Sequence, residues 1–352
     1  MGTVPEIAII GYAQSPSWRR AELTEPQFLF PVISDAIERA GIERRDIGFT
    51  CAGSCDYLSG QTFAFVMNLE AVGAWPPISE SHVEMDGAWA LYEAWVRLQH
   101  GDVDTALAFG SGKSSPGTPA EIYPLQMDPY TLTPLGIDPV SIAALQARAM
   151  LDRNLITEHE MAAIAARSLA AAKGNPYAQV SGDFDVDALL AEPYVTAPLR
   201  KHDLPPISDG ATAVVLATAA KAKEVCEHPV WIRGIDHRIE IHQPGMRDLT
   251  ESPSTRLAGE HAGVGEGKVD AAELSASFTH QEKILRNELG LGDDVEINPS
   301  GGALAANPMM AVGLSRFAEA ARQIAEHGKH RVVAHATSGQ ALQQNLVAVL
   351  EA

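Results

Sequence analysis

The chain has 352 residues, 46% of them hydrophobic and 20% charged, so it can bury a large core and form two closely packed halves. Its 26 basic and 45 acidic side chains give a formal net charge of −19, which argues against a nucleic-acid partner or an anionic membrane surface. Its three cysteines form no disulfide framework, and Cys51 and Cys55 lack the further ligands that zinc needs, so we expect no metal. We expect a cytoplasmic protein, because Met1 leads almost directly into a strand and no apolar run reaches the roughly 20 residues that span a bilayer.

Strands and helices alternate along the chain, which predicts an α/β fold. The first series comprises strands at 6–12, 47–53, 105–109 and 211–216 and helices at 31–40 and 86–100, the second of them capped by Asp86. The second series comprises strands at 230–239, 271–277, 295–298, 331–337 and 343–349, a helix ending at 289 and a long helix at 304–327. Residues 111–206, rich in proline and then helical at 141–152 and 158–173, indicate a lid inserted into the first series.

Two short segments repeat along the chain. Gln99-His100-Gly101 is followed, after one strand, by Ser111-Gly112, and Glu326-His327-Gly328 is followed in the same way by Ser338-Gly339. The interval from glycine to serine is ten residues in both. We therefore predict an internal duplication, with an N-terminal half at 1–228 that includes the lid and a C-terminal half at 229–352.

The segment Ile297-Asn298-Pro299-Ser300-Gly301-Gly302, followed by Ala306-Asn307-Pro308, has the pattern of a strand, a glycine turn and the start of a helix. A helix N-terminus presents unpaired N–H groups and partial positive charge, which suit an anion or a developing oxyanion. We expect Gly301 and Gly302 to form one wall of an active site.

Four segments, spread over most of the chain, carry a family resemblance. They are Ala90-Leu91-Tyr92 with the helix and strand after it, Ile207-Ser208-Asp209-Gly210-Ala211-Thr212-Ala213, Glu273-Leu274-Ser275-Ala276-Ser277-Phe278, and Asn298-Pro299-Ser300-Gly301-Gly302. In order and spacing they resemble the signatures of thiolases of the sterol-carrier-protein type. The resemblance implies two duplicated α/β halves in a layered α-β-α-β-α core with a lid insertion.

Two further segments, Phe278-Thr279-His280-Gln281 and Gly339-Gln340-Ala341-Leu342-Gln343-Gln344-Asn345, are similar to a divergent branch, the lipid-transfer-protein-like homologues of bacterial steroid side-chain degradation. The resemblance implies either a retro-aldolase that acts on β-hydroxyacyl-CoA thioesters or a companion subunit of one. CoA would then enter as part of the substrate, with no covalent cofactor. It also implies a dimer through the core sheet and a partner that is a zinc-ribbon/OB-fold protein or a second thiolase-like subunit.

The residues that give thiolases their reactivity are replaced here. The nucleophilic cysteine corresponds to Glu84, or to Met85 if the register shifts by one, and the second cysteine corresponds to Ser277. Two histidines correspond to Ser275 and Asn307. Because a thiolase needs an activated thiolate, the resemblance excludes acyl-cysteine chemistry.

Retro-aldol cleavage needs only a base for the hydroxyl proton and donors for the enolate. His280 could be a base with a pKa near neutrality or an ordinary residue of a first helical turn, and Glu84 a desolvated base or a buried acid paired with a donor. Asn307 could donate to the thioester oxygen or satisfy the entry of a helix, and Gln340 is expected to line the same cavity. The tyrosines that the resemblance gives as acid/base groups correspond to Ser275 and Gln340, which keeps a non-catalytic subunit open as the alternative.

The remaining candidates are substrate contacts: Ser275, Ser277, Gly301, Gly302, Gly339 and Lys113. Lys113 lies in Gly110-Ser111-Gly112-Lys113-Ser114, which lacks the first glycine of a P-loop because Leu107 occupies that position. It is expected to be either a loop charge or a contact for a phosphate of CoA.

Overall fold

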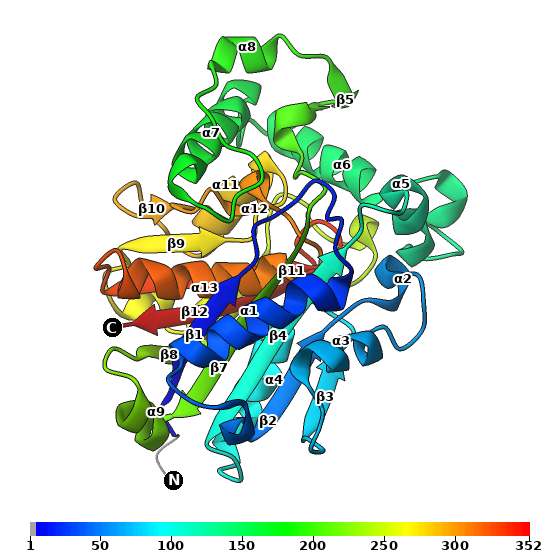
Figure 1. Ribbon diagram of the computed structural model, residues 1–352. Helices are drawn as coiled ribbons and strands as arrows, with labels where there is room; N and C mark the ends of the chain where they lie inside the picture. Colours follow the sequence, from blue (N-terminus) through cyan, green and yellow to red (C-terminus); the bar gives the residue numbers. More distant parts are fainter. Residues whose placement is uncertain (1–4) are drawn as a thin grey trace.

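The computed structural model describes residues 5–352 and contains one ten-stranded sheet, in the order β10-β9-β11-β12-β8-β1-β7-β4-β2-β3 (Figure 1). Its strands are β1 (Ile7–Gln14), β2 (Phe49–Gly53), β3 (Glu80–Val83), β4 (Thr105–Lys113), β7 (Asp209–Thr218), β8 (Val230–Ile239), β9 (Ala271–Leu274), β10 (Glu296–Ile297), β11 (Arg331–Ser338) and β12 (Gln344–Glu351). The short strands β5 (Tyr194–Thr196) and β6 (Leu199–Arg200) pair separately. The α-helices are α1 (Glu25–Arg39), α2 (Asp56–Ser59), α3 (Phe65–Val72), α4 (Gly87–Gln99), α5 (Pro119–Ile122), α6 (Pro139–Asp152), α7 (Glu158–Ala171), α8 (Val186–Leu190), α9 (Ala219–Val225), α10 (Pro253–His261), α11 (Thr279–Glu288), α12 (Gly302–Ala305) and α13 (Val312–Ala325). The predicted α/β class is confirmed.

The strand order is mirrored about the centre of the sheet. Outward from β1 it runs β1-β7-β4-β2-β3, and outward from β8 it runs β8-β12-β11-β9-β10. β1 and β8 pair antiparallel and join the two sets, while β2, β3 and β4 are mutually parallel, as are β9, β10 and β11. The two repeated segments surround β4 and β11, which occupy equivalent places in the mirrored order. The division of the chain between 228 and 229 stays a prediction.

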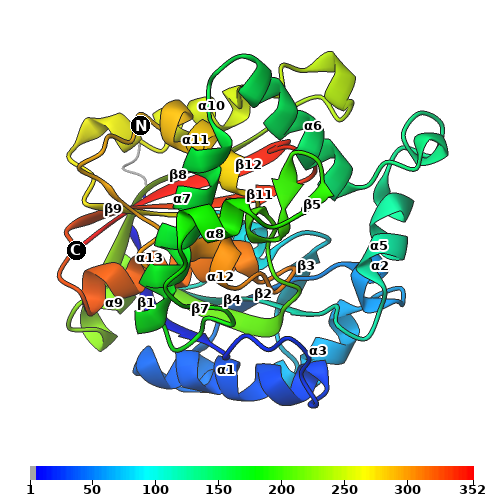
Figure 2. The ribbon, with the colours of Figure 1, turned by 90° about the horizontal axis from the view of Figure 1, so that it is seen from above.

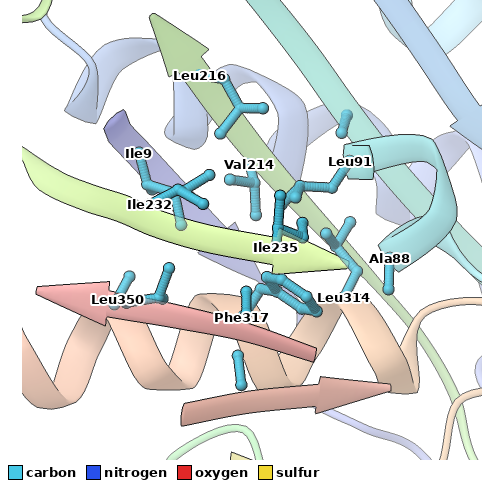
Figure 3. Close-up of a cluster of buried hydrophobic side chains, with 14 of the residues drawn as sticks. Ile9, Ala88, Leu91, Val214, Leu216, Ile232, Ile235, Leu314, Phe317 and Leu350 are labelled. Carbon is cyan, nitrogen blue, oxygen red and sulfur yellow. The ribbon is translucent and has the colours of Figure 1, made fainter. Parts of the chain in front are cut away.

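Successive side chains of each strand point to opposite faces of the sheet, which divides the hydrophobic core into separate layers. Ile9 of β1 packs with the central helices α4 and α13, whereas its neighbour Ile10 points to the other face and packs with α1. Figure 3 shows Leu314 and Phe317 of α13 among side chains from both sets of strands. α10 and α11 cover the outer face of the second set. The layers are thus helix, strand, helix, strand, helix.

Residues between β4 and β7 form the lid, which stands over one end of the sheet (Figure 1). Seen from above, α7 and α8 lie over the middle of the sheet, α6 lies beside them, and α5 lies further to one side, next to α2 (Figure 2). The lid contacts α2 of the first half through α5 and α11 and α12 of the second half through α7. No helix within residues 5–352 has both the length and the apolar character to cross a membrane.

Two helices differ from their predicted bounds. α1 begins at Glu25, because Pro26 rather than Pro31 occupies the first turn and the Gln27 side chain accepts from the Thr24 N–H at 2.8 Å. The predicted helix at 304–327 is instead α12 and α13, separated by residues 306–311. Pro308 accounts for the break, since a proline disfavours the helical conformation of the residue before it and supplies no N–H.

Candidate active site

The candidate residues gather at the end of the sheet under the lid, where the parallel strands have their carboxyl ends. Glu84 follows β3, Lys113 ends β4, Ser275 follows β9, and Gly339 and Gln340 follow β11. The Ser275 N–H donates to the backbone oxygen of His335 in β11 at 3.2 Å, so the ends of β9 and β11 lie together. Loops at this edge of an α/β sheet are where ligands commonly bind.

Asp86 joins the loops of the two halves. Its carboxylate accepts from the Ala88 N–H at 2.8 Å, as predicted for the cap of α4, and also from the N–H groups of Gly313 (3.0 Å) and Leu314 (2.9 Å) at the start of α13. The Gly87 N–H donates to the Met310 oxygen at 2.8 Å. Burial raises the pKa of the Asp86 carboxyl, against the lowering effect of these backbone donors. One carboxylate therefore caps two helices and fixes the loop of Glu84 beside the loop of Asn307.

Asn307 lies in the loop between α12 and α13, so the predicted helix start is wrong. Its N–H donates to the Ser208 hydroxyl at 3.0 Å, while its buried side-chain oxygen has no hydrogen-bond partner within residues 5–352. The loop passes close to β4: a Cβ added at Gly112 would lie 2.0 Å from the Met309 oxygen. The backbone bond holds Asn307 in place, its amide nitrogen lies 3.8 Å from the Met309 sulfur, and its side-chain oxygen is left without a partner.

Glu84 is exposed, so neither a desolvated base nor a buried acid describes it. Its Oε1 accepts from the N–H of Asp56, the residue after Cys55, at 2.6 Å. Burial and, after it, the charge of Glu84 raise the pKa of the Cys55 thiol. Met85, the alternative residue at this position, is half-buried and packs against the central core.

Two adjacent lid residues, Gln126 and Met127, contact the loops of the first and second halves respectively. The Gln126 amide nitrogen lies 3.4 Å from the Cys55 sulfur, and the Gln340 amide nitrogen lies 3.0 Å from the Met127 sulfur. Gln340 and Cys55 therefore contact adjacent residues of the same lid segment. Cys55, Gln126 and Met127 were absent from the sequence-based set, because no motif connects a proline-rich insertion to the loops beneath it.

His280 is fully buried, and its Nε2 lies 3.1 Å from the Gln146 oxygen of α6. Burial lowers the pKa of His280 to about 3, so the expected base with a pKa near neutrality is wrong. Ser275 is also buried, and its hydroxyl has no partner among the residues described, whereas Ser277 is half-buried. Of this group Ser277 alone has appreciable exposure to solvent.

The glycine turn does not form an open oxyanion wall. The Gly301 N–H donates to the Asn298 oxygen at 2.8 Å and the Gly302 N–H points to the Ser300 hydroxyl at 3.3 Å, so both groups are satisfied internally. Glycine is required at 301 and 302 because φ is +95° and +63° there. The turn instead covers a buried ion pair, since the Ser300 hydroxyl donates to Glu273 at 2.6 Å and Arg316 lies 2.9 Å from the same carboxylate. The cavity beside it has a volume of about 10 Å³, enough for one water molecule.

The two remaining candidates lie at the ends of strands. The Lys113 ammonium donates to the Leu23 carbonyl, and its side chain is half-buried. Gly339 is exposed with φ at +74°, in a turn that favours glycine. Residues 5–352 contain no cluster of three or more His, Cys, Asp or Glu side chains that could hold a metal ion.

We compared the sequence and the structure with those of known proteins. No protein-family model matches the chain. It is 26% identical to an acetyl-CoA acetyltransferase of Methanothermobacter thermautotrophicus, over 93% of each chain, and 29% identical to human sterol carrier protein 2, over 49% of this chain and 36% of that protein. Its structure matches that of an Ltp2-ChsH2(DUF35) aldolase with a TM-score of 0.85 and 20% identity, over 99% of each chain.

The layered fold, the mirrored sheet and these similarities agree with the resemblance drawn from the sequence. The chain is similar in sequence to thiolases over most of its length, and its fold is the thiolase-like fold of the aldolase that it matches.

Proposed function

We propose that this chain is a component of a thiolase-like retro-aldolase that cleaves a β-hydroxyacyl-CoA, with CoA present as part of the substrate and no covalent cofactor. The observation that carries the proposal is Glu84, an exposed carboxylate that the family resemblance aligns with the thiolase nucleophile, with Met85 as the alternative. The cysteines lie elsewhere: Cys51 is inside β2, Cys55 caps α2, and Cys226 follows α9. Burial raises the pKa of the Cys51 thiol to about 12, which leaves it unreactive.

In the proposed reaction Glu84 removes the proton of the β-hydroxyl group. The bond between the α and β carbons then breaks, the β carbon becomes a ketone or aldehyde, and the electron pair forms the thioester enolate. The carboxamides of Asn307 and Gln340 donate hydrogen bonds to the enolate oxygen, and the α carbon takes up a proton to give a shorter acyl-CoA. His280, neutral and enclosed, takes no part in this transfer, and Ser275, Ser277, Gly339 and Lys113 remain proposed substrate contacts.

A steroid-derived acyl group is the finer part of the proposal. It rests on the likeness of the Phe278–Gln281 and Gly339–Asn345 segments to the steroid-degrading branch. We also propose a dimer through the core sheet. β3 is one of the two outer strands of that sheet and exposes Ser81 and His82, which supports pairing with a second copy.

The test is incubation of the chain, alone and with co-expressed partners, with a steroid β-hydroxyacyl-CoA, and detection of the carbonyl product by mass spectrometry. E84Q is expected to lower kcat by roughly 100-fold or more, which is the usual contribution of a general base. The matched control is E227Q, since the Glu227 side chain is 89% exposed and lies outside the candidate site. Absence of cleavage in every combination, or equal activity of E84Q and E227Q, refutes the proposal.

A second candidate is a non-catalytic subunit that completes a heteromer with a zinc-ribbon/OB-fold protein or another thiolase-like chain. It is favoured by Ser275 and Gln340, neither of which can transfer a proton as a tyrosine does. Light scattering of the purified chain, alone and co-expressed with such a partner, separates the candidates. A stable homodimer that cleaves the thioester defeats this second candidate.

A further inference from the structure

One residue of the lid lies near Cys55, although no sequence pattern marks it. Tyr123 begins a 3₁₀ turn, Tyr123–Gln126, directly after α5. Side chains three residues apart in a 3₁₀ helix lie one above the other, so Tyr123 and Gln126 share a face. Because the Gln126 amide lies 3.4 Å from the Cys55 sulfur, that face is the one turned toward the first half of the molecule.

The surroundings of Tyr123 agree with this direction. Its ring is half-buried, and burial and, second, the neighbouring Cys55 raise the pKa of the phenol. Its hydroxyl has no hydrogen-bond partner among the residues that the structure describes, whereas the hydroxyls of Tyr12 and Tyr194 both donate to carboxylates. Tyr123 thus brings a neutral, unpaired donor to the lid side of the site.

The loop of Cys55 also carries an acceptor, the Glu84 carboxylate. The Glu84 carboxylate accepts from the N–H of Asp56, the residue after Cys55, at 2.6 Å, which holds it in place while it stays open to solvent. A phenol and a carboxylate that both lie near Cys55 supply a donor and an acceptor. A small hydroxyl group can accept from the first and donate to the second.

We propose that Tyr123 is the residue that recognises the β-hydroxyl group of the acyl substrate and holds it toward Glu84. The proposal deepens the proposed function, on which it rests for the class of substrate. Met127, four residues further along the lid, contacts Gln340 of the second half, so the same segment spans the site from the hydroxyl side to the enolate side.

The test measures recognition separately from catalysis. Calorimetry gives dissociation constants of the full-length chain for a β-hydroxyacyl-CoA and for the same acyl-CoA without the hydroxyl group. The wild type is expected to prefer the hydroxylated thioester by roughly 3- to 10-fold, the usual effect of one hydrogen bond. Y123F is expected to reduce this preference to less than about 2-fold by weakening only the hydroxylated ligand.

The matched control is Y130F, because Tyr130 is in the same lid but its side chain is 88% exposed. Y130F should keep the wild-type preference, and limited proteolysis should give the same lid fragments for all three proteins. Equal weakening of both ligands by Y123F, or an unchanged preference, overturns the proposal.

The outcomes also separate this inference from the proposed function. A preference that Y123F abolishes, in a protein that cleaves neither thioester, supports the role of Tyr123 and refutes the retro-aldolase. If the wild type cleaves the hydroxylated thioester and Y123F keeps the same binding preference, the retro-aldolase is supported and the role of Tyr123 is refuted. Failure of the wild type to bind either thioester overturns both.

Discussion

Acidification should destabilise this protein through its buried histidines. His280 and His335 are both fully buried, and burial lowers the pKa of the first to about 3 and of the second to about 4, from an ordinary value of 6.5. Each is neutral in the folded chain and takes up a proton near pH 6.5 once unfolded. Between pH 6.5 and these lowered values the unfolded state binds more protons, so stability is complete above pH 6.5 and is lost as the pH falls.

The size of the effect follows from linkage. Each pH unit in this window costs about 1.4 kcal/mol for one histidine. From pH 6.5 to 5, His280 alone therefore removes about 2 kcal/mol, a large part of the roughly 5–15 kcal/mol of a typical domain. Carboxyl groups with raised pKa values, such as Glu273 and Asp86, act in the opposite direction, so the comparison must be made between variants.

The variant to compare is H280Q, which keeps a donor for the Gln146 oxygen that His280 contacts at 3.1 Å. Urea unfolding, followed by tryptophan fluorescence at pH 7.5 and at pH 5, gives the free energy of unfolding of each protein. The loss on acidification should be smaller in H280Q than in the wild type by about 2 kcal/mol.

The control is H228Q, because the His228 side chain is 83% exposed. H228Q should lose as much stability as the wild type. Equal losses in H280Q and the wild type would show that His280 is protonated in the folded chain, and the description of its surroundings would then be wrong.

Three further perturbations test other parts of the structure. D86A removes the cap of two helices at once and should cost about 2–4 kcal/mol of unfolding free energy, measured in urea; a cost below about 1 kcal/mol would contradict the shared cap. G112A places a Cβ 2.0 Å from a backbone oxygen of the Asn307 loop and should abolish thioester binding, whereas G117A meets its nearest atom at 3.7 Å and should leave calorimetric binding unchanged. R316M leaves the buried Glu273 carboxylate without its ion-pair partner and should lower the free energy of unfolding by about 3–5 kcal/mol. The double variant R316M/E273Q should recover much of this loss in thermal melts; if the effects of the two substitutions simply add, the pair does not interact as described.

Much of the fold follows from local patterns in the chain. The apolar runs of β1, β4 and β7 and the cap of α4 by Asp86 could be predicted, because each depends on neighbours in sequence. The second role of Asp86 could not, since Gly313 is 227 residues away and is brought close only by packing of the two central helices. The break before α13 was missed because the apolar positions on either side of Pro308 continue the helical pattern.

The candidate site was less predictable than the fold. Glu84 and Asn307 were found through the resemblance to thiolases, but their exposure and hydrogen bonds depend on the conformation of loops, which no local sequence pattern predicts. His280 has the residue type of a base, and only its enclosure against Gln146 removes that role. Tyr123 carried no pattern, because its place depends on how the lid turns back onto Cys55.

The mirrored sheet has a consequence for synthesis on the ribosome. β1 begins at residue 7, yet its partner β8 begins only at residue 230. The central core also lacks one of its two helices until α13 ends at residue 325. Through most of translation the nascent chain therefore carries an open strand edge and an unfilled apolar layer, the features that favour aggregation and chaperone binding. Loss of residues 312–352 would leave that layer permanently unfilled, so a premature stop codon that removes this last part of the chain should be as damaging as an early one.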